Sequence, residues 1–326
     1  GRLVKGKTVA VKVNLTGQAA LRLGHVSAGR AHWTHPSVVA AAAHLFGKAG
    51  ARRIRILEGC FAAAEPLEEF MLSAGWDPGP ILAAAPRVEF ENTNVLGRAK
   101  RYVRMIVPGG GLIYPGFDLN HSYADCDVFV SLAKMKEHAT AGITLSMKNC
   151  FGVPPCTIYG HNAGKDEPSP APYGGRDMFH DGRRQPSRSA PQEIAHGLPR
   201  EGGVRVPRII VDIVAARPID LAIVEAVETM NHGEGPWIPG GRLIAPGVLV
   251  AGTNCVTADA VCAAIMGFDP MAGRGMAPFE RCESTLELAE QAGLGTRDLK
   301  RIEVLGVPVR EARFDFRRPP TSYPSA

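Results

Sequence analysis

The chain has 326 residues, of which 45% are hydrophobic and 21% are charged. This balance is typical of a globular protein and excludes a disordered or fibrous chain, while the length allows one large domain or two modest ones. The net charge is +5, but basic residues are interleaved with acidic ones and form no stripe with aromatic residues. Nucleic-acid binding is therefore not expected, and a small anionic molecule is the favoured partner.

The apolar runs are too short to cross a membrane. The longest, such as 243–250 and 258–265, fall well below the roughly 20 residues that a transmembrane helix needs. We therefore expect a soluble protein without a membrane span, located in the cytoplasm or exported after removal of a signal. The 7 cysteines form no C-x-x-C pair, which disfavours a disulfide scaffold. The oligomeric state stays open.

Strands and helices alternate along the first part of the chain. The β-branched run 8–14 predicts a strand, Thr34-His35-Pro36 predicts the start of a helix that ends before Gly50, and 53–59 predicts the next strand. Such a β-α-β unit favours a parallel sheet with helices packed against it. We then expect a helix at 66–74, a strand at 87–91, and apolar runs at 102–107 and 112–114 on either side of a glycine turn. The run 127–132 lacks polar alternation, which is typical of a strand buried on both faces.

A long segment rich in Pro, Gly and Arg, 153–207, interrupts this pattern. Loops of this length are often lids, so we expect this segment, with Arg176, His180, Arg183 and Arg184, to fold over a cleft. Beyond it the sequence predicts helices at 209–215, 257–266 and 285–292, and strands at 221–227, 248–252 and 301–305. The expected fold is α/β, with a mixed, mostly parallel sheet, helices on both faces and a long irregular insertion. Residues 1–152 would form an N-terminal lobe, 153–207 the insertion or lid, and 208–326 a C-terminal lobe that completes the same domain.

The segment after the strand at 127–132 carries the strongest functional signal. Open α/β sheets bind ligands beyond the carboxyl ends of their strands, and this strand leads directly into Lys134, Lys136 and His138. In an extended chain these three side chains share one face, where the two ammonium groups repel unless an anion lies between them. Further polar residues follow, and the candidate ligand-binding residues of this segment are Lys134, Thr140, Thr144, Lys148 and Asn149. The alternative is a solvated edge that carries lysines.

The first strand ends with a second candidate pair, Lys12 and Asn14, which lie on one face. A lysine inside an apolar strand is costly to bury unless it meets a partner, so both residues are candidate ligand contacts. The alternative is an edge strand whose lysine reaches water.

A third group follows the strand at 221–227. Glu225 could neutralise the lysines or act as a general base, and Glu228 and His232 could hold a divalent metal ion together with His35. An ordinary acidic turn is the alternative, because Gly233, Gly235 and Pro236 favour a turn by themselves.

Several motifs in a fixed order resemble a known family over nearly the whole chain. They are Val11-Lys12-Val13-Asn14, Thr34-His35-Pro36, Lys134-x-Lys136-x-His138, Lys148-Asn149-x-Phe151-Gly152, Gly235-Pro236-Trp237 and Asp259-Ala260-Val261. The family is called Domain of Unknown Function 362. Some members look fused to ferredoxin-like iron–sulfur modules, which would imply a redox partner, but this chain has no such cysteine pattern. It also departs at Glu225-Ala226, where the resemblance implies Asp-Gly, so the carboxylate reaches one methylene further.

Two functional hypotheses follow from these residues. The first is an enzyme that acts on a small carboxylate- or phosphate-bearing molecule held by the lysines, with Lys136, His138 or Glu225 as catalytic residues. The alternative is a metal- or iron–sulfur/redox-associated binding protein without catalysis of its own, which would use Glu228, His232 and either His35 or Cys150. A binding module without chemistry is a third hypothesis. No P-loop, dinucleotide-binding, serine-hydrolase or zinc-protease motif is present to assign the reaction.

Overall fold

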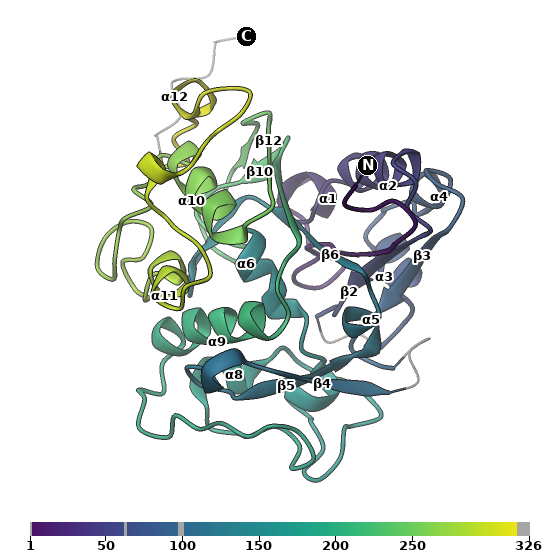
Figure 1. Cartoon of the computed structure of the whole chain (residues 1–326), viewed down its shortest axis with the longest axis vertical. Helices are drawn as coiled ribbons and strands as arrows, with labels where there is room; N and C mark the ends of the chain where they lie inside the picture. The colour runs from purple at the N-terminus through teal and green to yellow at the C-terminus, as the bar shows by residue number, and fades with distance from the viewer. Residues whose placement is uncertain (1, 62–63, 97–100, 318–326) are drawn as a thin grey trace.

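The computed structural model describes residues 2–61, 64–96 and 101–317 and is built around a six-stranded sheet (Figure 1). The strand order is β12-β9-β6-β1-β2-β3, and all neighbours are parallel except β12, which runs antiparallel to β9. The predicted mixed, mostly parallel sheet is confirmed. Its strands are β1 (Thr8–Lys12), β2 (Arg53–Glu58), β3 (Val88–Asn92), β6 (Val128–Lys134), β9 (Leu221–Ala226) and β12 (Val248–Gly252).

Both faces of the sheet are covered by helices, as predicted. Successive side chains of a strand point to opposite faces. On β1, Val9 and Val11 belong to one hydrophobic cluster, which includes α2 (Pro36–Lys48) and α3 (Leu67–Ser73). Ala10 belongs to the opposite cluster, which includes α9 (Gly202–Ala216) and α10 (Cys255–Ile265). The sheet is therefore the middle layer, with α2 and α3 on one side and α9 and α10 on the other (Figure 1).

A two-stranded hairpin, β4 (Tyr102–Ile106) and β5 (Gly116–Asn120), lies beside α8 (Asp177–Asp181) and α9 (Figure 1). The apolar run 112–114 precedes β5 and forms no strand itself. Its backbone N–H groups donate to Asp212 of α9 instead, with Leu112, Ile113 and Tyr114 at 2.6–3.0 Å from the carboxylate. Gly111 permits this path, since its φ is +81° and a Cβ there would lie 2.1 Å from the Tyr114 carbonyl oxygen.

The long insertion is irregular, as predicted, with two short helices, α7 (Cys156–Tyr159) and α8 (Asp177–Asp181). Its end differs from the prediction, because α9 already begins at Gly202 and contains Pro207. Gly202, Gly203 and Pro207 are poor helix formers, so the sequence pattern conceals the first turns. Buried Arg205 of α9 donates to both carboxylate oxygens of Glu193 in the insertion, at 2.9 and 2.8 Å, and this pair holds the insertion against the helix.

The predicted last strand at 301–305 is wrong. Residues 299–301 form the 3₁₀ helix η3 (Leu299–Arg301), no strand follows it in the described chain, and Leu305 is 83% exposed. An apolar run becomes a strand only where a neighbouring strand offers hydrogen-bond partners, and here β12 forms the edge of the sheet.

The remaining elements are short and connect the layers. These elements are α1 (Ala28–Ala31), α4 (Gly79–Leu82), η1 (Pro108–Gly110), α5 (His121–Ala124), β7 (Lys136–His138), β8 (Gly142–Thr144), α6 (Ser146–Asn149), η2 (Cys150–Gly152), β10 (Thr229–Met230), β11 (Leu243–Ile244), α11 (Thr285–Gln291) and α12 (Val309–Ala312).

None of the described helices has the length and apolarity needed to cross a membrane.

Candidate functional site

Four neighbouring parallel strands end in charged residues at the same edge of the sheet. In sheet order these residues are Glu225 of β9, Lys134 of β6, Lys12 of β1 and Glu58 of β2, and all four are buried. They pair across adjacent strands, with Lys134 Nζ 2.6 Å from Glu225 Oε1 and Lys12 Nζ 2.6 Å from Glu58 Oε1. These two lysines therefore already have carboxylate partners within the protein.

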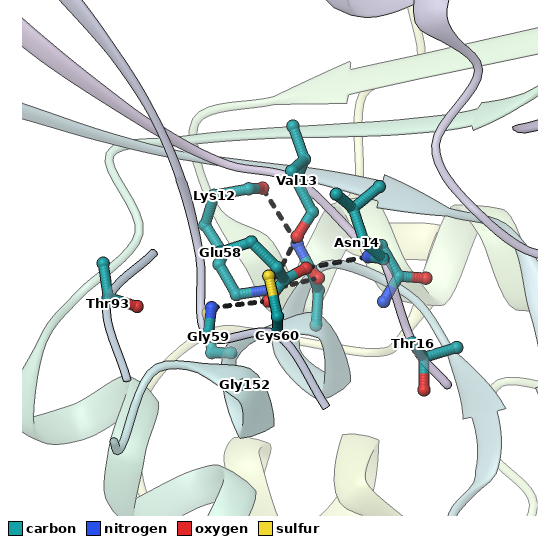
Figure 2. A network of polar contacts seen from close by, with 12 residues as sticks. Lys12, Val13, Asn14, Thr16, Glu58, Gly59, Cys60, Thr93 and Gly152 are labelled. Carbon is teal, nitrogen blue, oxygen red and sulfur yellow. Dashed lines mark hydrogen bonds and ion pairs between the residues drawn. The ribbon is translucent and has the colours of Figure 1, made fainter. Parts of the chain in front are cut away.

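The Lys12–Glu58 pair lies at the centre of a hydrogen-bond network (Figure 2). Glu58 accepts from the backbone N–H groups of Leu15 at 2.7 Å and Gly59 at 2.9 Å. Lys12 Nζ also donates to the Val13 carbonyl at 2.6 Å and to Asn149 Oδ1 at 3.2 Å. This many partners fix both charged groups in place.

Lys134 and Lys136 connect the end of β6 to the segment 228–234. Beyond its ion pair, Lys134 Nζ donates to the Glu228 carbonyl at 2.7 Å. Lys136 Nζ donates to the carbonyls of His32 at 2.6 Å and Glu234 at 2.9 Å, and burial lowers the pKa of Lys136 well below its usual value. Neither residue lines the cavity described below. We therefore leave both lysines out of the proposed ligand contacts.

Glu225 is held by backbone donors as well as by Lys134. Its Oε1 accepts from the N–H of His35 at 2.8 Å and its Oε2 from the N–H of Val227 at 3.1 Å. The carboxylate is fully buried and lies outside the cavity lining. Its placement gives no support to the general-base hypothesis and makes Glu225 a cross-link between β9, β6 and the start of α2.

A cavity of about 480 Å³ opens at the carboxyl edge of the sheet, next to the Lys12–Glu58 network. This volume is in the range of small-molecule sites. Six of the candidate catalytic and ligand-binding residues lie in its wall, namely Lys12, Asn14, His138, Thr140, Lys148 and Asn149. Thr144 lies outside the wall, buried and without a hydrogen-bond partner for its Oγ1 among the described residues.

Lys148 is a cation of this wall that lacks a carboxylate partner among the described residues. Its Nζ lies 4.4 Å from the centroid of the Phe151 ring and makes no hydrogen bond or ion pair with the part of the chain that the structure describes. Burial lowers the pKa of Lys148 to about 8, nearby Glu234 partly offsets this, and Lys12 and Arg176 disfavour the ammonium further. Near neutral pH the side chain is still mostly protonated, so it presents a poorly solvated charge to the cavity.

The short helix that carries Lys148 is held at its start by Asp259 of α10. The Asp259 carboxylate accepts from the N–H groups of Ser146 and Met147, each at 2.9 Å, and from the Ser146 hydroxyl at 2.6 Å. Burial raises the pKa of Asp259 to about 6. Asp259 therefore lies within α10 but caps the start of the neighbouring helix α6.

We expect Asp259→Ala to lower the free energy of unfolding by about 2–4 kcal/mol, because three buried donors lose their acceptor. Urea denaturation measures this, with Asp77→Ala as the control. Asp77 accepts a single 2.8 Å bond from the N–H of Gly79 at an exposed turn, so its loss should cost less than about 1 kcal/mol. Equal stability of the two variants would contradict the proposed role of Asp259.

Two histidines present opposite hydrogen-bonding groups to the cavity. His138 Nδ1 accepts from the N–H groups of Thr140 at 3.0 Å and Ala141 at 3.2 Å, and burial together with Lys148 keeps its pKa well below the usual value. The ring is thus neutral with its proton on Nε2, a donor. His180 Nδ1 lies 3.2 Å from the Arg176 carbonyl, and burial lowers its pKa too. That Nδ1 carries the proton, which leaves Nε2 of His180 as an acceptor.

Arg176 is a second cation of the wall, supplied with His180 by the insertion. It is 6% exposed, and its guanidinium donates to the carbonyls of Pro154 at 2.5 Å and Gly152 at 2.9 Å. No carboxylate of the described residues lies within ion-pair distance of it. A single arginine in a Pro- and Gly-rich loop has no sequence signal of its own, so it was noted only as part of the expected lid. Arg183 and Arg184 of that loop are exposed and lie outside the cavity.

The three proposed metal ligands are not brought together. Both Glu228 carboxylate oxygens lie 2.6 Å from the guanidinium of Arg30. His35 Nδ1 accepts from the N–H of Ser37 at the start of α2, and His232 is exposed. Across residues 2–61, 64–96 and 101–317, no group of three or more His, Cys, Asp or Glu side chains could hold a metal ion. The geometry gives the metal hypothesis no support.

Comparisons with known proteins place the chain in a family. Among solved structures, a crystal structure of a protein from Thermotoga maritima is similar over 89% of this chain, with 14% sequence identity and a TM-score of 0.36, and this chain spans 56% of that one. The curated proteins contain no match. The family model described as Domain of unknown function (DUF362) matches residues 9–264. Since that match spans most of the chain, the chain belongs to the DUF362 family.

Proposed function

We propose that the cavity binds a small organic anion, a carboxylate or a phosphate ester, and that the protein is an enzyme acting on it. The observation that carries this proposal is Lys148, a poorly solvated ammonium in the cavity wall with no carboxylate partner among the described residues. An unpaired charge of this kind is costly for the folded protein, and a bound anion offsets the cost.

The charges around the cavity favour an anion near Lys148 and Arg176. Three carboxylates also line the cavity, but Glu58 is paired with Lys12, and Glu234 accepts from the N–H of Ala139 at 2.9 Å. The third, Asp177, lies at the exposed end next to His161. Arg176 is satisfied only by neutral acceptors, so it and Lys148 are cations of the wall that form no ion pair with the described residues.

Other wall groups are suited to orienting an organic ligand. The buried Oδ1 of Asn14 has no hydrogen-bond partner in the described part of the chain. Buried polar groups usually have partners, so a hydrogen-bond donor on the ligand is a natural one here. Thr140 adds a hydroxyl to the same wall.

The two histidines suggest proton transfer as the chemistry. His180 presents a free Nε2 lone pair, and its lowered pKa keeps it unprotonated near neutral pH, as a general base requires. His138 presents Nε2–H, which can donate to an oxygen that gains negative charge as the proton leaves. Lys148 and Arg176 would hold the anionic group beside them.

The pH dependence of anion affinity tests the proposal. We expect sulfate to bind through protonated Lys148, so the affinity for sulfate is highest below pH 8. Above pH 8 the affinity falls up to tenfold per pH unit. The fall ends at the pKa of Lys148 in the complex, which the bound anion raises. Calorimetric titration from about pH 7 to about pH 10 measures this, because the charge of sulfate is constant there. An affinity that does not change with pH, or no binding at all, would contradict the proposal.

A further inference from the structure

Trp237 lies in the wall of the cavity with much of its ring uncovered. It is 40% exposed, whereas the other two tryptophans, Trp33 and Trp76, are buried. Its indole Nε1–H donates to Glu234 Oε1 at 3.0 Å. The ring is therefore anchored at its polar edge and presents apolar surface to the cavity.

Backbone packing holds the same ring rigidly. A Cβ atom built on Gly17 would lie 2.5 Å from the Trp237 ring, and one built on Gly235 would lie 2.2 Å from it. Only glycine lets both backbone segments approach this closely. The edge of His32 adds a T-shaped contact with ring centroids 5.9 Å apart. An aromatic ring that is fixed in position but uncovered on one side is a preformed contact surface.

Glu234 connects this surface to the segment that carries His138. While one carboxylate oxygen holds Trp237, the other accepts from the N–H of Ala139 and lies 4.0 Å from His138 Nδ1. The same carboxylate is the nearby negative charge that raises the pKa of Lys148 against the effect of burial. The indole thus shares the wall of one cavity with Lys148 and Arg176.

The cavity is far larger than an inorganic anion. A tetrahedral oxyanion fills roughly three water volumes, or ~90 Å³, whereas the cavity measures about 480 Å³. The rest of its wall includes the apolar side chains of Leu15, Leu21, Phe61 and Phe151. Most of the space is therefore suited to an apolar body attached to the anionic group.

We infer that the ligand is an aromatic organic anion, an aryl carboxylate or aryl phosphate, whose ring packs on Trp237 while Lys148 and Arg176 hold the anionic group. This inference rests on the proposed function, because the ring is placed relative to an anion at Lys148. An aromatic ring fits better than an aliphatic one, since two rings in an offset-stacked or edge-to-face arrangement gain energy beyond their buried area.

Tryptophan fluorescence of the unmodified protein tests the ring contact without any variant. Acrylamide quenches exposed tryptophan, and Trp237 is the exposed one of the three. We expect phenyl phosphate to protect the emission from acrylamide at concentrations where inorganic phosphate does not. If acrylamide quenches the emission equally in saturating phenyl phosphate and in saturating inorganic phosphate, the inference is overturned.

Affinities of matched anions provide the second test. We expect phenyl phosphate to bind at least about tenfold tighter than inorganic phosphate, and benzoate likewise tighter than acetate and cyclohexanecarboxylate. Trp237→Leu is expected to reduce each preference to about threefold or less, and Trp237→Phe to retain most of it. Calorimetry measures all of these constants.

The outcomes separate this inference from the proposed function. If aryl and plain anions bind equally well and Lys148→Met weakens both, the aromatic inference fails and anion binding stands. If none of the anions binds, or if Lys148→Met changes no affinity, both fail. A preference for phenyl phosphate that persists in Trp237→Leu would also overturn the assignment of the ring to Trp237.

Discussion

Lys148→Met is expected to weaken sulfate binding about 30- to 100-fold and, in the same protein, to raise the free energy of unfolding by about 1–2 kcal/mol. The affinity falls because the variant lacks the charge that an anion would contact. The stability rises because burial already disfavours the Lys148 ammonium, as its pKa of about 8 shows. Methionine keeps the length of the side chain and its packing on Phe151, where a thioether contact with the ring replaces the ammonium. Calorimetry with sulfate and urea denaturation measure the two effects.

Lys300→Met is the matched control for this variant. Lys300 is exposed and lies in η3, away from the cavity lining, so neither sulfate affinity nor stability should change measurably. If only the substitution at position 148 raises stability and lowers sulfate affinity, Lys148 serves function although it destabilises the folded protein. If Lys148→Met destabilises the protein and leaves sulfate affinity unchanged, Lys148 has a structural role and the proposed function is wrong.

Glu225→Gln is expected to lower the free energy of unfolding by about 3–5 kcal/mol, the largest loss of stability among these variants. Lys134 and Glu225 face each other on β6 and β9, both are fully buried, and their charged atoms lie 2.6 Å apart. Glutamine fits the same space but leaves the Lys134 ammonium without its counter-charge in a region of low polarity. It also turns an amide N–H₂ toward backbone donors, since Glu225 accepts from the N–H groups of His35 and Val227.

A double-mutant cycle identifies the pair as the cause. When Lys134→Met is added to Glu225→Gln, the buried charge is gone, and we expect the double variant to be more stable than the sum of the single effects by about 2 kcal/mol or more. Glu201→Gln is the control, because its ion pair with Arg274 is about half exposed on both sides and should cost less than about 1 kcal/mol. Additive effects in the cycle would show that the two charges do not depend on each other.

Local patterns were sufficient to predict much of the fold. Helix α2 begins at Pro36, within the predicted start Thr34-His35-Pro36, because proline at the first position and a capping side chain are local signals. The apolar run of β6 identified a central strand because strands buried on both faces have no polar alternation, and β-branched residues marked β1 as a strand. Where these signals were weak or misleading, as at the glycines of α9 or the run 301–305, the prediction missed the boundary or the element.

The candidate site was only partly accessible to sequence reasoning. The chain order alone indicated that charged residues gather at the carboxyl edge of a parallel sheet, and it singled out Lys12, His138 and Lys148. It could not tell which lysines are neutralised within the protein, because Glu225 and Glu58 reach Lys134 and Lys12 from neighbouring strands far away in the chain. Arg176 and His180 reach the cavity from an irregular loop that has no periodic pattern.

The sequence by itself determined the alternation of strands and helices, and with it the sheet and the edge at which polar residues collect, since these depend on local propensity and periodicity. Only the tertiary structure decided which charges are paired, which remain open to the cavity, and where Trp237 lies relative to them. The physical reason is that pairing and desolvation depend on distances of a few ångströms between segments that are remote in sequence, and no local pattern encodes those distances.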